Sequence, residues 1–282
     1  MWERYQRELQ RDTVAAPHRP TPRLWDDTGL HAAWLGHSTV LLQLEGTTLL
    51  TDPVFSDRVG VNLGVATVGP KRLVTPALRT DELPPIDVVL LSHAHMDHFD
   101  LPSLRSLESK KTQVVTAAKT SDLLRVDQWC GVTELAWGQS AQIGPLAIRA
   151  FEVRHWGARV QTDTWRGYNG YVIESPRYRV LFGGDTAMSD TFGQLRTTRG
   201  IDLTVMPVGA YNPWIRAHCS PEQAVLMANA AGGEFFLGVH HQTFELGSEP
   251  RREPMERLEA SLRGAAHRLA MTEIGQEFHF QR

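Results

Sequence analysis

Cysteine is scarce in this chain, which has only Cys130 and Cys219 among its 282 residues. Two cysteines are too few for a disulfide framework and are not spaced as in a zinc knuckle, so we expect a reducing compartment. A single disulfide bond between the two cysteines remains an alternative. The sequence also lacks a run of 18 apolar residues and a signal-peptide-like apolar stretch at its start. These absences predict a cytoplasmic protein without a membrane span.

Basic residues do not predominate either. The chain has 29 Lys and Arg against 32 Asp and Glu, a formal net charge of -3, and no dense Lys/Arg block. This balance supplies no positive field for a nucleic acid, so no nucleic-acid partner is expected. With 41% hydrophobic residues, the chain can bury one large core. We predict a single domain over residues 1–282, in which residues 1–30 form a Pro-rich lead-in.

Trp2, Tyr5 and Leu9 fall close to one face of a helix near the start of the sequence. Such a stripe most often docks on its own domain, and this is the interpretation that we favour. Peripheral contact with a membrane is the alternative. The sequence leaves this choice open, as it does the choice between a monomer and a homodimer.

Apolar runs alternate with segments that carry helix signals along the chain. Ser220, Pro221 and Gln223 give the clearest signal, because they combine a cap, a first-turn proline and a capping box. This alternation predicts an α/β fold with polar residues where strands end. The predicted strands are residues 32–51 with a turn at 45–46, 86–91, 113–116, 134–137, 146–153, 170–174, 178–182, 203–207, 235–239 and 278–280. The predicted helices begin at Asp100, cover 121–129, run from Ser220 to 232–233, and cover 255–269, while residues 56–85 form a loop.

The segment from Ser92 to His98 reads Ser-His-Ala-His-Met-Asp-His and directly follows the predicted strand 86–91. Imidazole and carboxylate are the ligands that suit zinc and its neighbours among the transition metals. If the loop begins extended, His93 and His95 point to one side, because side chains two positions apart share a face. Asp97 and His98 come after the chain bends and can turn to a second ion. The spacing therefore predicts two adjacent metals.

Four residues cannot satisfy two metals, so further ligands are expected at other strand ends. His155 follows the strand that ends at Val153, Asp185 follows the strand that ends at Phe182, and His240 follows the strand that ends at Val239. An isolated polar residue at a strand end is more often structural than functional. The joint placement of these three at successive strand ends favours a shared metal site.

This set of candidate ligands, His93 to His98 with His155, Asp185 and His240, resembles the metal-binding motif of the metallo-beta-lactamase fold hydrolases. Within that superfamily, the chain is most similar to the N-acyl phosphatidylethanolamine phospholipase D family, over about residues 32–246. The blocks that carry this similarity are Trp34-Leu35-Gly36-His37-Ser38-Thr39, Thr51-Asp52-Pro53, Gly69-Pro70-Lys71-Arg72, Ala210-Tyr211-Asn212-Pro213, Pro221-Glu222-Gln223-Ala224, and His240 with Thr243-Phe244.

The resemblance implies a four-layer αβ/βα sandwich, classed as α/β or in some schemes α+β, with two zinc ions between the sheets. It implies that one ion is held by His93, His95 and His155, the other by Asp97, His98 and His240, and that Asp185 bridges both. His218 matches a histidine over the site, and His37 and Asp52 match residues that orient the ligands. Mn²⁺ or iron could replace zinc.

These residues lead us to expect a zinc-dependent phosphodiesterase of phospholipase D type, acting on a phospholipid or glycerophosphodiester. Asp97 could orient the attacking hydroxide, and His218 could act as a general acid or stabilise charge on the leaving oxygen. Aromatic and imidazole side chains near the ligand loops could line the substrate pocket. These candidates are Trp156, Tyr211, Trp214 and His241.

Other functions stay open on the sequence. A lactonase or another carbon-ester or amide hydrolase of the same fold is the main alternative. An iron-dependent oxidoreductase and a nuclease are lower-ranked alternatives. A Cys219 nucleophile beside His218 is disfavoured, because side chains adjacent in sequence rarely meet as a thiolate and base must. His241-Gln242 stands where the family has Trp-Gly, and a long amino-terminal extension is lacking. The headgroup and acyl preferences therefore stay open.

Overall fold

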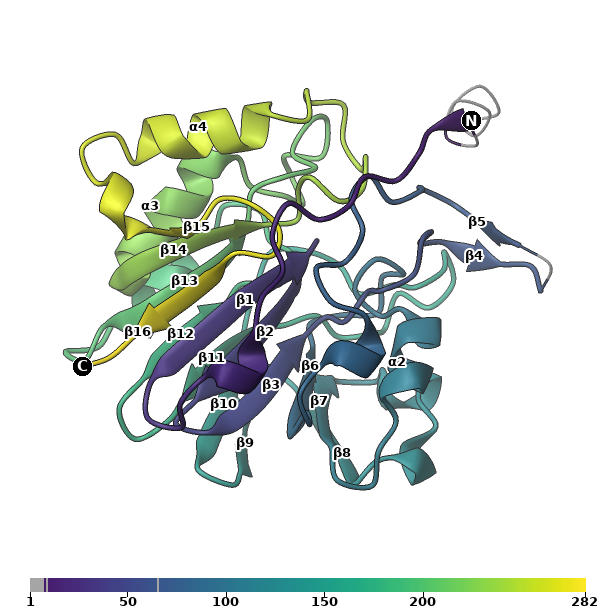
Figure 1. Ribbon diagram of the computed structural model, residues 1–282, viewed down its shortest axis with the longest axis horizontal. Helices are drawn as coiled ribbons and strands as arrows, with labels where there is room; N and C mark the ends of the chain where they lie inside the picture. The colour runs from purple at the N-terminus through teal and green to yellow at the C-terminus, as the bar shows by residue number, and fades with distance from the viewer. Residues whose placement is uncertain (1–7, 9, 65) are drawn as a thin grey trace.

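Two seven-stranded sheets face one another in the computed structural model, which describes residues 8, 10–64 and 66–282 (Figure 1). The first sheet contains, in order, β16 (Glu277–Phe280), β1 (Leu30–Gly36), β2 (Thr39–Leu44), β3 (Thr47–Thr51), β6 (Val88–Leu91), β7 (Gln113–Ala117) and β8 (Gly131–Leu135). The second contains β15 (Leu269–Met271), β14 (Gly233–Val239), β13 (Ile201–Pro207), β12 (Arg179–Phe182), β11 (Gly170–Glu174), β10 (Leu146–Phe151) and β9 (Ser140–Ile143).

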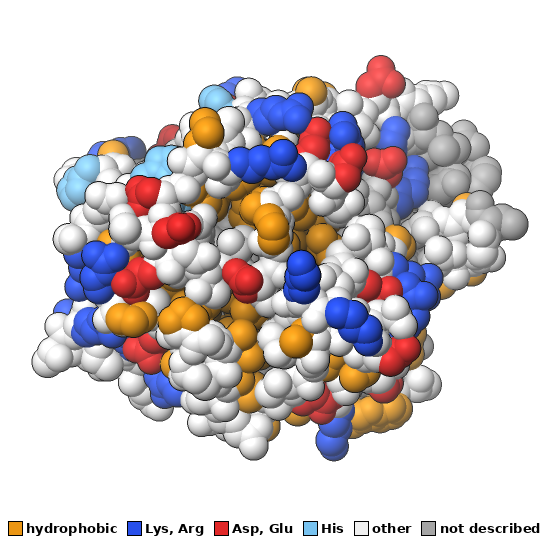
Figure 2. All heavy atoms as spheres, turned by 60° about the horizontal axis from the view of Figure 1, so that its bottom comes forward, with side chains coloured by type: hydrophobic (Ala, Val, Ile, Leu, Met, Phe, Trp, Pro, Cys, Tyr) orange, Lys and Arg blue, Asp and Glu red, His pale blue; other side chains and the backbone are white. Residues whose placement is uncertain are grey.

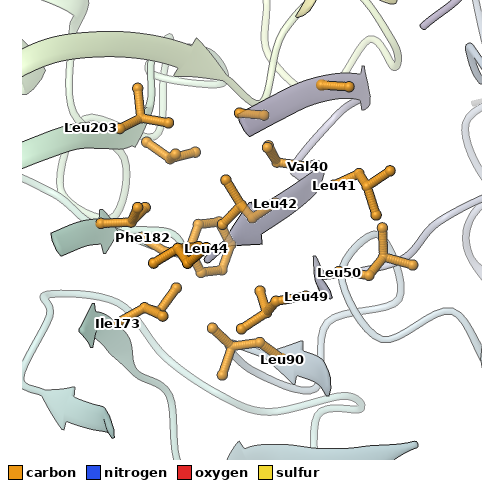
Figure 3. Close-up of a cluster of buried hydrophobic side chains, with 14 of the residues drawn as sticks. Val40, Leu41, Leu42, Leu44, Leu49, Leu50, Leu90, Ile173, Phe182 and Leu203 are labelled. Carbon is orange, nitrogen blue, oxygen red and sulfur yellow. The ribbon is translucent and has the colours of Figure 1, made fainter. Parts of the chain in front are cut away.

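The main hydrophobic core lies between the two sheets. Figure 3 shows Leu42 and Leu44 of β2 in one cluster with Ile173, Phe182 and Leu203 of the second sheet. All five side chains are fully buried. Each contributes roughly 1.5–3 kcal/mol through removal from water, so this layer supplies much of the drive that holds the sheets together.

Helices cover the outer face of each sheet. On the first, α2 (Leu101–Leu107) packs Leu104 against β6 and β7, and the Asp100 side chain caps it by accepting from Ser103 N. On the second, α3 (Pro221–Ala231) packs against β13 and β14, and α4 (Glu253–Ser261) packs against α3 and β14. The predicted Ser220 capping box is present. The four-layer αβ/βα sandwich is thereby confirmed.

Strand direction brings one end of many strands to a common edge. β3, β6, β7 and β8 run parallel in the first sheet, as do β12, β13, β14 and β15 in the second. β1 is antiparallel to β2, which is antiparallel to β3, and β10 is related to β12 in the same way through β11. β1 and β10 therefore run in the same direction as β3 and β12. Residues that follow the carboxyl ends of these strands can therefore meet.

Several predicted elements are wrong in detail. The helix at 121–129 is two 3-10 turns, η3 (Ser121–Leu123) and η4 (Val126–Gln128). The helix at 255–269 ends with α4 near Ser261, because Gly264 adopts a φ of 89° and the chain then forms η6 (Ala266–Arg268) and β15.

The long segment 56–85 is not purely a loop, since it contains β4 (Val61–Asn62) paired with β5 (Thr67–Val68), and η2 (Thr80–Glu82). The lead-in contains η1 (Pro22–Leu24), and η5 (Asp190–Leu195) follows β12. Both cysteines are free thiols. The stripe of Trp2, Tyr5 and Leu9 lies outside the described residues.

Within the described part of the chain, no helix is both long and apolar enough to cross a bilayer. Figure 2 shows one face of the molecule, on which Lys and Arg side chains are interspersed with Asp and Glu. The absence of a nucleic-acid partner stays a prediction from the charge balance.

Candidate metal centre

All seven predicted ligands lie at the edge where the parallel strands end. The loop that carries His93, His95, Asp97 and His98 follows β6 in the first sheet. His155, Asp185 and His240 follow β10, β12 and β14 in the second sheet. The facing sheets thus bring together side chains that are far apart in the sequence.

The first cluster consists of His93, His95, His155 and Asp185, whose ligand atoms all lie within 4.8 Å of one another. His93 Nε2 lies 2.8 Å and His155 Nε2 lies 3.2 Å from His95 Nδ1. His155 Nδ1 lies 2.9 Å from the carbonyl oxygen of Ala217, to which it donates. This bond leaves the Nε2 lone pair of His155 directed into the cluster, as ligation requires.

The second cluster consists of Asp97, His98, His240 and His37, again within 4.8 Å. Asp97 Oδ2 lies 3.1 Å from His37 Nε2, 3.4 Å from His240 Nε2 and 3.5 Å from His98 Nε2. The Asp97 side chain is 17% exposed, whereas the three imidazoles are buried. Solvent can therefore reach this cluster on the Asp97 side.

Asp185 joins the two clusters. Its Oδ2 atom lies 3.1 Å from His98 Nε2 and 3.2 Å from His240 Nε2, and 3.7 Å from His155 Nε2. A carboxylate with imidazoles of both clusters around it is suited to bridge two ions.

Unpartnered atoms converge on this point. His98 Nε2, His240 Nε2 and Asp185 Oδ1 are buried and have no hydrogen-bond partner among the described residues. A buried polar atom without a partner costs about 1–3 kcal/mol, so such atoms call for something that binds them. Imidazole nitrogens and a carboxylate fit metal ions of the zinc type. The two clusters are therefore consistent with a dinuclear metal site.

The electrostatics of the clusters follow from burial and from mutual charge. Burial opposes ionisation of Asp185, but the histidines around it outweigh burial and hold its pKa well below the usual value. Burial also opposes protonation of His240, yet Asp185 and Asp97 raise its pKa to about 9. The carboxylates therefore favour positive charge at this position, and bound cations would supply that charge in place of protons.

His37 and Asp52 lie directly behind the second cluster. His37 contacts Asp97, and His98 Nδ1 lies 2.7 Å from Asp52 Oδ2. His37, Asp52 and His240 adopt positive φ angles of 52°, 30° and 66°. Non-glycine residues in this region store strain and persist where surrounding contacts hold them. One such contact crosses the sheets, because His240 N donates to His37 O at 3.2 Å.

His218 lies over the clusters, as the resemblance implied. It follows β13 and precedes the Ser220 cap, and its ring centroid is 5.0 Å from that of His155 and 5.2 Å from that of His240. Its Nδ1 atom is 3.8 Å from Asp185 Oδ2. Burial lowers the pKa of His218 to about 4, so the imidazole is neutral near pH 7 in the metal-free protein.

Cys219 is not placed to act as a nucleophile. Its thiol is fully buried, its Sγ donates to Pro207 O at 3.2 Å, and burial raises its pKa far above the usual value. A thiol that cannot ionise is inert.

The four candidate pocket residues are placed differently. Trp156 is 44% exposed and its ring centroid lies 4.3 Å from that of His155, so it borders the site. Trp214 is exposed in the turn that leads to His218. Tyr211 is buried and donates its hydroxyl to Glu253. His241 is buried and stacks on Trp34, and it lines a cavity together with His240, so its place in the substrate pocket stays a prediction.

Two residues that support the ligand loop were not identified from the sequence. Arg159 donates to the carbonyl oxygens of Ala94 at 3.0 Å and Phe99 at 2.8 Å, and so fixes the loop at both ends. Ser92 is fully buried and bonds to Asp52. An arginine in a loop usually indicates a solvated charge, and a serine before a histidine carries no distinctive pattern, so neither had a usable signal.

Comparison with known proteins fits this geometry. The family model described as "Beta-lactamase superfamily domain" matches residues 47–241, which include all seven candidate ligands. The chain belongs to the metallo-beta-lactamase superfamily. N-acyl-phosphatidylethanolamine-hydrolyzing phospholipase D 1 of Caenorhabditis elegans is 31% identical over 260 residues, which cover 83% of this chain and 71% of that protein.

Other similar proteins extend the comparison. An uncharacterized protein of Mycobacterium tuberculosis is 34% identical over 273 residues, which cover 93% of this chain and 72% of the relative. Among solved structures, an isothiocyanate hydrolase from Delia radicum gut bacteria matches with a TM-score of 0.71 at 17% identity, covering 89% of this chain and 99% of that one. At that identity the match shows the fold alone. Together with the paired clusters, the family membership makes this chain a metal-dependent hydrolase of the superfamily.

Replacing Asp185 with asparagine tests whether the clusters hold metal together. The amide removes the shared negative charge, so we expect D185N to retain less than half of the metal that the wild type binds, measured by elemental analysis after dialysis. The exposed Asp190→Asn variant is the control and should match the wild type. Full metal content in D185N would show that Asp185 is not a ligand.

Proposed function

We propose that this protein is a dinuclear zinc phosphodiesterase of phospholipase D type, acting on a phospholipid or glycerophosphodiester. The observation that carries the proposal is Asp185, whose Oδ2 atom lies within 4 Å of imidazoles from both clusters. The reaction class is supported by the C. elegans relative, whose name describes phospholipase D hydrolysis of an N-acylated phosphatidylethanolamine.

The ligand assignment proposed here follows the two clusters. His93, His95 and His155 would hold one ion, Asp97, His98 and His240 the other, and Asp185 both. Zinc ions held there would lower the pKa of bound water from 15.7 to about 7 and would neutralise charge on a phosphodiester. Asp97 reaches solvent on one side and accepts from His37 on the other. That contact fixes its carboxylate, which we propose orients the attacking hydroxide.

His218 is proposed to act on the leaving oxygen. Because its imidazole is neutral near pH 7 in the metal-free protein, it would work there as a hydrogen-bond donor and not as a positive charge. A ring N–H aimed at an oxygen that gains negative charge stabilises the transition state more than the substrate. In this role His218 stabilises the leaving oxygen as a neutral hydrogen-bond donor, and does not protonate it as an imidazolium acid.

An exposed tryptophan beside the site, Trp156, and two exposed tryptophans on nearby stretches of the sequence support a lipid substrate. Trp156 and Trp214 are 44% and 53% exposed, and Trp165 on the loop after His155 is 58% exposed. A contiguous exposed apolar patch marks a ligand or membrane contact, whereas apolar side chains scattered singly over a surface are ordinary. We propose that they contact acyl chains, with the protein meeting the membrane peripherally.

Parallel turnover measurements test the reaction class. The zinc-loaded protein should hydrolyse bis-p-nitrophenyl phosphate and an N-acyl phosphatidylethanolamine faster than it opens any of a panel of lactones. The metal-free protein is the control and should be inactive on both panels. A lactone rate well above the phosphodiester rate would overturn the proposal and favour hydrolysis at carbon.

A His218→Ala variant tests the role of the neutral imidazole. Loss of one donor to a developing oxyanion typically lowers kcat by about 10²–10³-fold, and we expect that loss with little change in KM. The variant should keep both ions by elemental analysis. His267→Ala, at an exposed position, is the matched control. An H218A kcat within twofold of the wild type, or the loss of an ion, would contradict this role.

A further inference from the structure

Ser92 lies between the two metal clusters, at the point where β6 ends. It is fully buried, and its backbone N–H donates to Asp52 Oδ1 at 2.7 Å. Its hydroxyl oxygen lies 2.5 Å from Asp52 Oδ2 and 2.8 Å from His93 Nδ1. The serine therefore contacts a carboxylate on one side and a candidate ligand on the other.

The direction of each hydrogen bond follows from the available protons. Asp52 as a carboxylate only accepts, so the single hydroxyl proton of Ser92 goes to Asp52. The same oxygen can then only accept from His93, which must carry its proton on Nδ1. That tautomer leaves the Nε2 lone pair of His93 free and directed into the first cluster.

Asp52 also accepts from the second cluster. His98 Nδ1 donates to the same Oδ2 atom at 2.7 Å, which leaves the His98 Nε2 atom facing Asp185 at 3.1 Å. One buried oxygen thus orients His98 directly and His93 through the Ser92 hydroxyl. The two rings belong to different clusters.

The surroundings hold Ser92 in this position. Its carbonyl oxygen accepts from Asn169 N at 2.9 Å, in the segment just before β11 of the second sheet. Gly184 packs so closely that a Cβ atom there would lie 2.9 Å from Ser92 Cβ and 2.7 Å from Asn169 O. Contacts from both sheets therefore fix the hydroxyl, and the residue after Gly184 is the shared Asp185.

We propose that Ser92 and Asp52 form one positioning unit that serves both metal sites. Ser92 orients the ring of His93 at the first site, and Asp52 orients rings at both sites. This inference depends on the metal centre and not on the substrate proposed above. It would hold for a lactonase as well as for a phosphodiesterase. Outer partners of metal ligands typically change metal affinity by about 10–100-fold when they are removed.

The zinc affinities of the full-length protein test this role. They are measured by competition with chelators, separately for each of the two zinc equivalents. We expect S92A to weaken one equivalent about 10–100-fold and the other less than threefold. Asp52→Asn should weaken both. Thr116→Val removes another buried hydroxyl, which lies 2.6 Å from Thr120 Oγ1, and should leave both affinities unchanged.

The position of the remaining ion distinguishes positioning from a general loss of structure. In crystals of S92A with one equivalent of zinc, anomalous scattering should place the ion among Asp97, His98 and His240. Two unchanged affinities in S92A, equal weakening of both, or an ion among His93, His95 and His155 would overturn the proposal. D52N is an independent check if S92A folds poorly, since weakening at one ion alone would also contradict it.

Discussion

The Asp185 carboxylate is the constraint on which the rest of the site depends. It is buried among imidazoles from both clusters, and one of its oxygens has no hydrogen-bond partner among the described residues. An ionised carboxylate in such a place costs several kcal/mol unless cations compensate it. In the metal-free protein, protonation of His98 and His240 supplies part of that compensation. A pair of divalent ions would supply it more completely.

The fold brings the remaining candidate ligands to this carboxylate through strand direction. β6, β10, β12 and β14 all end at one edge, and their facing sheets are fixed by the core of leucine, isoleucine and phenylalanine side chains between them. Hydrogen bonds from surrounding groups then fix the orientation of these side chains. Asp52 orients His98, the Ala217 carbonyl orients His155, and Arg159 holds the ligand loop by its carbonyl groups.

The sequence was sufficient where local chemistry decides the structure. The ligand loop, the three downstream strand ends and the Ser220 cap could all be predicted, because residue type and spacing carry the signal at those points. The segment 121–129 and the end of α4 could not, since a short mixed pattern there satisfies a helix or a series of turns equally well. Side-chain direction was also out of reach. His241 follows His240 directly, yet it packs on Trp34, while Trp156 borders the site.

Anomalous scattering from crystals of the zinc-loaded wild-type protein tests the central claim most directly. Two peaks about 3.5–4 Å apart are predicted, one beside His93, His95 and His155, the other beside Asp97, His98 and His240, with Asp185 in contact with both. A single ion shared by the four ligands of the loop, His93, His95, Asp97 and His98, would contradict the account.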